Sequence, residues 1–181
     1  ERKGLDVLLE ALPALPPDIR VWIGSDGPDT ERLKLRHAGD PRLEWLGRLS
    51  DLEKRRRLAA ARIFCAPSIH GESFGVVLLE AMAAGAAIVA SNLSGYSLVA
   101  RADRDALLVD PRDVTALAAG LNRVLDDPEL HGALVASGRR RAEEFSMDHL
   151  AERYVDLYDR VTTPARPSRG WRSPRSRRSA G

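Results

Sequence analysis

The sequence predicts an α/β fold, in which a doubly wound parallel sheet carries helices on both of its faces. Two observations predict it: short β-rich runs alternate with segments of helical periodicity, and glycine- or proline-containing breakers separate them. Strands that alternate with helices favour βαβ units, whose strands are parallel. Ligands of such sheets bind at the carboxyl ends of strands, where the loops at Gly24, Gly47 and Gly71 are expected.

The individual elements follow from their own start and stop signals. The first helix has apolar residues at helical spacing, Pro28 suits the first turn of the second, and Ser50 with Glu53 forms a capping box for the third. The expected strands span residues 20–24, 43–46, 62–66, 87–91 and 106–109. The expected helices span residues 5–15, 28–37, 50–61, 74–84, 113–125, 128–145 and 148–161.

The stretch from Gly71 to Gly85 is the most informative part of the chain. Its helix is apolar almost all round, which is typical of a buried helix, and Gly85 is a natural stop. Ser73 is expected to cap the helix and leave its first amides free, which makes an anion site suited to phosphate. Gly71 and Gly75 would let the backbone approach a ligand closely.

Two carboxylates, Glu72 and Glu80, accompany this helix. Within one helix they would lie roughly 12 Å apart, at about 1.5 Å per residue. A glycoside hydrolase needs its two carboxylates roughly 5 to 9.5 Å apart, so an acid/base pair is disfavoured. The spacing suits two hydroxyl-bearing ends of one elongated ligand, but a buried helix with one capping acid and one acid at the core edge explains it equally well.

Length and composition limit the alternatives. With 181 residues the chain can form one α/β domain, and its single cysteine, Cys65, excludes an internal disulfide framework. No apolar run approaches the roughly 20 residues that span a bilayer, and no signal peptide is evident. Because the chain begins at Glu1 and not at Met, we expect that an upstream part has been lost.

The last twenty residues differ from the rest. Residues 162–181 contain six arginines and no acid, so the net charge of +2 conceals an acidic domain over residues 1–161. Several prolines and serines, with Trp171 as the one large apolar side chain, predict a disordered basic tail. Such a tail is either a solvated extension or a contact for anionic lipid or nucleic acid.

Two competing signals point to other chemistry and are weak, and the motif for a third chemistry is absent. Asp103 and Asp105 resemble a metal-binding Asp-x-Asp, yet they precede a strand and favour a turn. His70-Gly71-Glu72 resembles part of a zinc deaminase signature, which also needs a later Cys-x-x-Cys. No Gly-x-Gly-x-x-Gly follows a strand, which disfavours a dinucleotide-dependent oxidoreductase.

A series of motifs, in order, resembles the C-terminal, donor-binding domain of the group 1 retaining glycosyltransferases, which have the two-domain GT-B fold. The motifs are Arg2-Lys3-Gly4, Gly24-Ser25-Asp26-Gly27-Pro28, Leu46-Gly47-Arg48-Leu49 and the pair Glu72 and Glu80. The chain is most similar to actinobacterial phosphatidylinositol mannosyltransferases, through Cys65-Ala-Pro, Gly71-Glu-Ser-Phe-Gly and Glu80-Ala-Met-Ala-Ala-Gly.

The resemblance implies a role for each matching residue. Lys3 would neutralise the leaving diphosphate and Glu72 would accept hydrogen bonds from donor-sugar hydroxyls, which makes these two the catalytic candidates. Glu80 would hold the ribose. The remaining donor-binding candidates are Leu49 and Lys54 at the base, Gly24 and Gly27 at the cleft floor, and Gly71, Ser73, Phe74, Gly75 and Val76 around the phosphates and sugar.

The implied reaction is transfer of a hexose with retention, most simply mannose from GDP-mannose to a phosphatidylinositol-type lipid. The sugar nucleotide is a substrate, and neither a cofactor nor a metal is implied. The acceptor would bind through an N-terminal domain, and the intact enzyme would be cytoplasmic and peripheral at the inner face of the cell membrane. The basic tail would add an anionic membrane contact, and nucleic acid is not an expected partner.

Departures from the family qualify this interpretation. The family's first strand and its diphosphate-binding arginine are absent, and that strand is central in the order 3-2-1-4-5-6. The strands at Val21 and Ile63 would then have no shared neighbour, and the chain by itself is expected to lack transfer activity. A hexosyltransferase that uses a UDP-sugar and a non-catalytic nucleotide- or nucleic-acid-binding module remain as alternatives.

Overall fold

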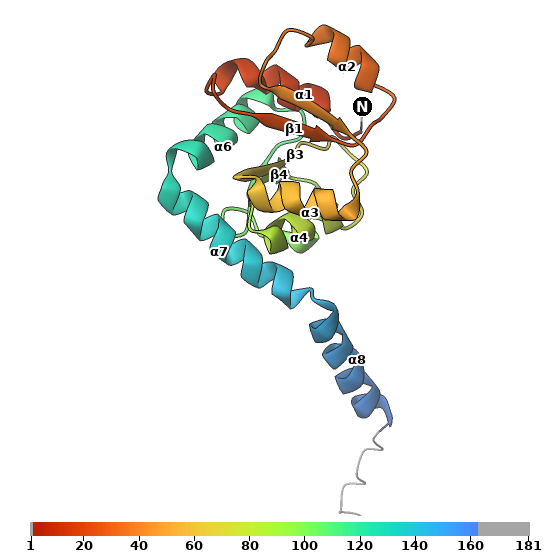
Figure 1. The fold of residues 1–181 in the computed structure, drawn as a ribbon. Helices are drawn as coiled ribbons and strands as arrows, with labels where there is room; N and C mark the ends of the chain where they lie inside the picture. The colour runs from red at the N-terminus through yellow and green to blue at the C-terminus, as the bar shows by residue number, and fades with distance from the viewer. Residues whose placement is uncertain (1, 163–181) are drawn as a thin grey trace, which may run out of the picture. The chain divides into compact units, whose positions relative to one another are not determined.

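The computed structural model describes residues 2–162 of the chain, in two units that meet at residues 146 and 147. The strands are β1 (Val21–Gly24), β2 (Leu43–Gly47), β3 (Ile63–Ala66), β4 (Ala87–Ser91) and β5 (Leu107–Val109) (Figure 1). The helices are α1 (Leu5–Ala11), the 3₁₀ helix η1 (Leu12–Ala14), α2 (Thr30–Arg36), α3 (Asp51–Ala60), α4 (Val76–Ala84), α5 (Ser94–Val99), α6 (Val114–Asp126), α7 (Pro128–Glu144) and α8 (Met147–Thr162). Apart from Thr162, the predicted basic tail lies outside the described residues.

The strands are parallel and form two sheets. β1 pairs with β2 in one sheet, and the order β3-β4-β5 makes the other. The predicted α/β fold class with parallel strands is therefore confirmed. In the part of the chain that the structure describes, no ladder joins β1 to β3, as expected for two strands without a shared neighbour.

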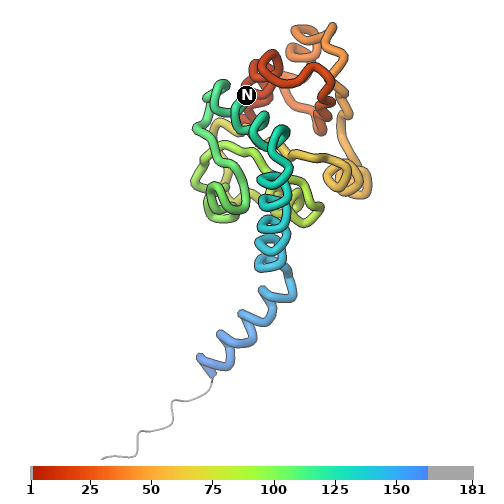
Figure 2. The backbone as a smooth tube through the Cα atoms, turned by 90° about the vertical axis from the view of Figure 1, so that its left-hand side faces the viewer, coloured from red at the N-terminus to blue at the C-terminus, as the bar shows by residue number. Residues whose placement is uncertain are grey.

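Strand β4 shows why the larger sheet is covered on both faces. All five of its residues are buried, and successive side chains of a strand point to opposite faces. Ala87 and Val89 pack in a cluster with side chains of α1 and α6, whereas Ile88 and Ala90 pack in a second cluster with side chains of α4 and α5. Helix α7 lies against α4 (Figures 1 and 2). The predicted helical cover on both faces is confirmed.

The helix boundaries follow local sequence signals, with three corrections. Ser50 caps α3 by accepting the amide of Glu53 at 3.2 Å, as predicted. The helix predicted for residues 5–15 changes from α to 3₁₀ at Leu12, because Pro13 has no amide to donate. Pro28 precedes α2 by two residues and is not in its first turn, and the sequence did not predict α5.

Helix α8 belongs to the second unit. Its apolar side chains recur on one side, as predicted, and Leu150, Tyr154, Leu157 and Val161 are all exposed. None of the described helices combines the length and the apolar character that a bilayer crossing requires.

Candidate donor-binding site

The segment before α1 lies along the loop between β3 and α4. The carbonyl of Arg2 accepts the amide of Ile69 at 2.9 Å, and the guanidinium of Arg2 donates to the carbonyl of Gly71 at 3.2 Å. Gly4 has a φ of 63°, and a Cβ atom there would lie 1.9 Å from the carbonyl oxygen of Pro67. Only glycine fits this approach, and the result is that Lys3 is held over the loop.

Glu72 is the charged centre of this loop. Lys3 Nζ lies 2.6 Å from Glu72 Oε1, and Ser68 Oγ donates to the same oxygen at 3.0 Å. The Glu72 side chain is 11% exposed, against 60% for Lys3. Burial acts to raise the pKa of Glu72, but the hydrogen bonds from Lys3 and Ser68 outweigh it, and the pKa is lowered. Glu72 is therefore an ionised, accepting carboxylate at neutral pH.

The start of α4 differs from the prediction. The cap is Gly75, in the left-handed conformation with a φ of 85°, and no side chain caps the helix. The prediction of Ser73 as cap is wrong, because the turn at Gly75 begins the helix two residues later. Glu72 consequently lies in the loop, and the roughly 12 Å estimate, which assumed helix from Glu72 to Glu80, does not apply.

The second carboxylate has its own lysine partner. Glu80 lies within α4, and Lys54 in the first turns of α3 donates to its Oε1 at 2.8 Å. Both side chains are about one-third exposed, and the hydrogen bond to Glu80 raises the pKa of Lys54. Because Ser50 caps α3, the helix begins at Asp51, which sets the position of Lys54 in its first turns. The structure thus brings together two predicted donor-binding residues that are 26 positions apart.

The predicted base loop lies against the end of β1. A Cβ atom on Gly24 would lie 3.2 Å from Leu49 Cδ1, so this glycine makes room for Leu49. The amide of Ser25 donates to the carbonyl of Gly47 at 2.6 Å and ties the two loops together. Gly27 is different, since a Cβ atom there would meet nothing within 4 Å. Its predicted part in the cleft floor stays a prediction.

The other predicted loop residues lie at the beginning of α4. Phe74 packs edge-on against Phe145, with ring centroids 5.7 Å apart, and so anchors the loop to the residue that follows α7. Val76 is largely exposed in the first turn of α4. Gly71 has a φ of 76°, and a Cβ atom there would lie 2.9 Å from the Arg2 side chain.

The Asp-x-Asp sequence has a structural role. Asp105 is fully buried and bonds the guanidinium of Arg101 through both of its oxygens, at 2.6 and 2.9 Å, and the hydroxyl of Ser137 at 2.7 Å. Asp103 lies in the turn before β5 with a φ of 56°. The predicted turn is confirmed. Among residues 2–162, no group of three or more potential metal-ligating side chains is assembled.

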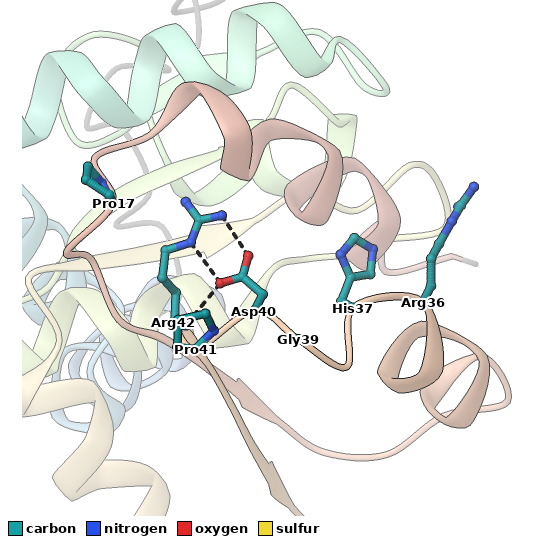
Figure 3. A pocket seen from close by; sticks show the side chains of 7 residues that line it. All are labelled: Pro17, Arg36, His37, Gly39, Asp40, Pro41 and Arg42. Atoms are coloured by element: carbon teal, nitrogen blue, oxygen red, sulfur yellow. Dashed lines mark hydrogen bonds and ion pairs between the residues drawn. The ribbon is translucent and has the colours of Figure 1, made fainter.

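A separate hollow of about 580 Å³ lies beside β2 and shares no residue with the site described above. Figure 3 shows the guanidinium of Arg42 directed at the carboxylate of Asp40, which it meets at 2.7 and 2.9 Å. The same guanidinium donates to the carbonyl of Leu12 at 2.8 Å. Its charge is therefore already used in joining η1 to the residues that precede β2.

Three residues of the site were not singled out from the sequence. Ser68 and Tyr96 are buried beneath Glu72, and a Cβ atom on Gly95 would lie 2.1 Å from the Glu72 carbonyl oxygen. They come from the end of β3 and from α5, so neither periodicity nor a local motif connects them with Glu72.

The chain is similar in sequence to known proteins. The family model for group 1 glycosyl transferases matches residues 1–127. A phosphatidyl-myo-inositol mannosyltransferase from Mycolicibacterium smegmatis is 38% identical, over 89% of this chain and 42% of its own length. A D-inositol 3-phosphate glycosyltransferase from Xylanimonas cellulosilytica is 36% identical, over 92% of this chain and 41% of its own length.

The fold comparison agrees. Sucrose-phosphate synthase from Thermosynechococcus elongatus superposes with a TM-score of 0.77 and 27% identity, over 88% of this chain and 42% of its own. The chain therefore spans less than half the length of these relatives. Its parallel α/β architecture corresponds to the Rossmann-like half of a GT-B enzyme. The chain belongs to the group 1 glycosyltransferase family.

Proposed function

We propose that the chain is the donor-binding half of a retaining hexosyltransferase that transfers mannose from GDP-mannose to a phosphatidylinositol-type lipid. One observation carries the donor role, namely the 2.6 Å ion pair between Lys3 and Glu72 at the loop before α4. It places a cation suited to a diphosphate next to a carboxylate suited to sugar hydroxyls. In a sugar nucleotide the diphosphate is bonded directly to the sugar, so a phosphate and sugar hydroxyls lie side by side in the ligand.

In this proposal each group acts on a different part of the donor. Cleavage of the bond between sugar and phosphate leaves negative charge on the diphosphate, which Lys3 stabilises. Glu72 accepts from hydroxyls of the sugar, and the amides at Phe74, Gly75 and Val76 contact phosphate or sugar. Glu80, oriented by Lys54, accepts from the two ribose hydroxyls, with the base beside Leu49. No step in this scheme requires a metal ion.

The choice of acceptor and location rests on the named relatives. Both curated relatives act on inositol-containing compounds by name, one of them a phosphatidyl-inositol. We infer that the intact enzyme uses an inositol lipid, bound through a region beyond the matched half, and works at the cytoplasmic face of a membrane. In the same proposal the arginines of residues 162–181 contact anionic lipid.

Calorimetric titration of the chain with GDP-mannose, UDP-glucose and GDP tests the donor role. We expect GDP-mannose to bind, and Glu72→Gln to weaken it while leaving GDP unaffected. Glu31→Gln, which changes a surface carboxylate that pairs with Lys34, is the matched control. A preference for UDP-glucose would change the proposed donor from GDP-mannose to a UDP-sugar. Absence of binding by any of these nucleotides would refute the proposed site.

Two further experiments separate the remaining alternatives. Deleting residues 162–181 should leave sugar-nucleotide affinity intact, whereas a nucleic-acid-binding module would lose its binding with the arginines. We also expect the 181 residues by themselves to bind the donor without transferring mannose. Robust mannosyl transfer to a lipid acceptor by the purified chain would show that the facing half is not needed.

A further inference from the structure

Two buried hydroxyl groups lie beneath the carboxylate of Glu72. Ser68, just after β3, and Tyr96, in α5, are each 1% exposed. The hydroxyl oxygen of Tyr96 lies 3.0 Å from Ser68 Oγ, which lies 3.0 Å from Glu72 Oε1. The three side chains form a continuous chain of hydrogen bonds, from the interior of the domain to the loop.

The charge on Glu72 fixes the direction of these hydrogen bonds. An ionised carboxylate only accepts, so the single O–H of Ser68 donates to Glu72. Ser68 Oγ then accepts the O–H of Tyr96. Burial raises the pKa of Tyr96, which keeps the phenol protonated and able to donate at neutral pH. The network therefore has one consistent proton arrangement.

The backbone around this network is closely packed. A Cβ atom on Gly95 would lie 2.1 Å from the Glu72 carbonyl oxygen, and one on Gly75 would lie 2.8 Å from Tyr96 Cδ1. Helix α5 thus supports the loop directly. Tyr96 touches both the hydroxyl of Ser68 and the residue at which α4 is capped, so its ring and its hydroxyl both define the loop position.

Two donors of Glu72 use the same oxygen. Lys3 and Ser68 both donate to Oε1, at 2.6 and 3.0 Å. A carboxylate oxygen has two lone-pair directions, so Oε1 can accept both hydrogen bonds. A carboxylate group that is held at Oε1 in this way cannot rotate freely about the bond to its side chain. The two donors therefore hold the Glu72 carboxylate in one orientation.

We propose that Ser68 and Tyr96 are positioning residues, which hold the carboxylate of Glu72 in the orientation that accepts hydrogen bonds from hydroxyls of the donor sugar. This inference rests on the proposed function and deepens it. Neither residue touches the sugar, since both are buried and act through Glu72. The nucleotide part of the donor, proposed to lie at Glu80 and Leu49, does not depend on them.

The first experiment measures the network without a ligand. The pKa of Glu72 is followed by carbon-13 NMR titration of the full chain, of Ser68→Ala and of Tyr96→Phe, with Glu72→Gln assigning the signal. A donated hydrogen bond stabilises the carboxylate, so its loss should raise the pKa, and more in Ser68→Ala than in Tyr96→Phe. Lys3 and Arg2, the cations that face Glu72, remain in every variant.

The matched control is Ser97→Ala. It removes a hydroxyl from α5, the helix that carries Tyr96. This hydroxyl bonds Asn92 and the carbonyl of Leu93 and not Glu72. This control should leave the pKa of Glu72 unchanged. An unchanged pKa in both Ser68→Ala and Tyr96→Phe would overturn the network.

The second experiment compares two ligands by calorimetry, because a positioning role affects only the one that carries sugar. Ser68→Ala and Tyr96→Phe should bind GDP-mannose about tenfold more weakly and GDP as the wild-type chain does. Equal loss for both ligands, or no loss for either, would overturn the positioning role. If the wild-type chain bound neither ligand, the proposed function would fail, while the titration would still decide whether the hydroxyls orient Glu72.

Discussion

Gly95→Ala is the sharpest single perturbation of the loop that carries Glu72. Gly95 lies in α5, where alanine is a better helix former than glycine, so local propensity favours the substitution. The new Cβ atom would nevertheless lie 2.1 Å from the carbonyl oxygen of Glu72, and real contacts of this kind do not fall below 3.0 Å. The loop must therefore retreat by about 0.9 Å, on the scale at which misplacement costs about a hundredfold in catalysis.

Two assays give the expected magnitudes. Overpacking of a closely packed site costs about 1–3 kcal/mol in the free energy of unfolding, which urea denaturation measures. Displacement of Glu72 should also weaken GDP-mannose binding by more than GDP binding. Gly132→Ala is the control, because a Cβ atom there meets nothing within 4 Å, and it should stabilise α7 by about 0.5–1 kcal/mol. If Gly95→Ala matched the wild-type chain in both assays, the steric reasoning would be refuted.

Three further predictions concern charge and burial. Lys54→Met removes the partner of Glu80 and should weaken GDP and GDP-mannose equally, by up to about fivefold in calorimetry; a loss confined to GDP-mannose would contradict the ribose role. The hydrogen bonds from Arg42 lower the pKa of Asp40 from 3.8 to about 2, so Asp40→Asn should destabilise the chain at pH 7. That difference should shrink as the pH falls below about 4 and through about 2, because the wild-type carboxylate becomes protonated in the folded chain there; a difference independent of pH in urea unfolding would exclude this origin. Burial raises the pKa of the Cys65 thiol to about 12, so Ellman's reagent at pH 8 should react much more slowly with the native chain than with the unfolded chain, and equal rates would contradict this.

The alternation of β-rich runs with segments of helical periodicity predicted the fold class and the place of each strand. A strand that is buried on both faces also needs a continuous apolar run. The run at residues 87–91 is the clearest case and coincides with β4. Helix α5 was not predicted because its first four residues, Ser94-Gly95-Tyr96-Ser97, have low helical propensity. It is helical because Tyr96 and Val99 are buried by tertiary packing, which no local pattern encodes.

The candidate site was predictable only in part. The pairing of Lys54 with Glu80 joins two residues that the sequence had separately marked, but the contact itself depends on how α3 packs on α4. The wrong cap at Ser73 arose because the left-handed backbone at Gly75 is a matter of conformation and not of composition. Ser68 and Tyr96, 28 residues apart, carry no motif, so only their proximity in the folded chain connects them.

Strand β4 has a consequence for how the larger sheet unfolds. Its residues alternate between the two hydrophobic clusters, one with α1 and α6 and the other with α4 and α5. Loss of either cluster would expose one whole face of β4, a strand that the other cluster also needs in place. We therefore expect the helix that carries Glu80 and the helices on the opposite face to unfold in one cooperative transition. A ligand that binds at α4 should then slow solvent exchange at amides on the far side of the sheet, which hydrogen exchange measures.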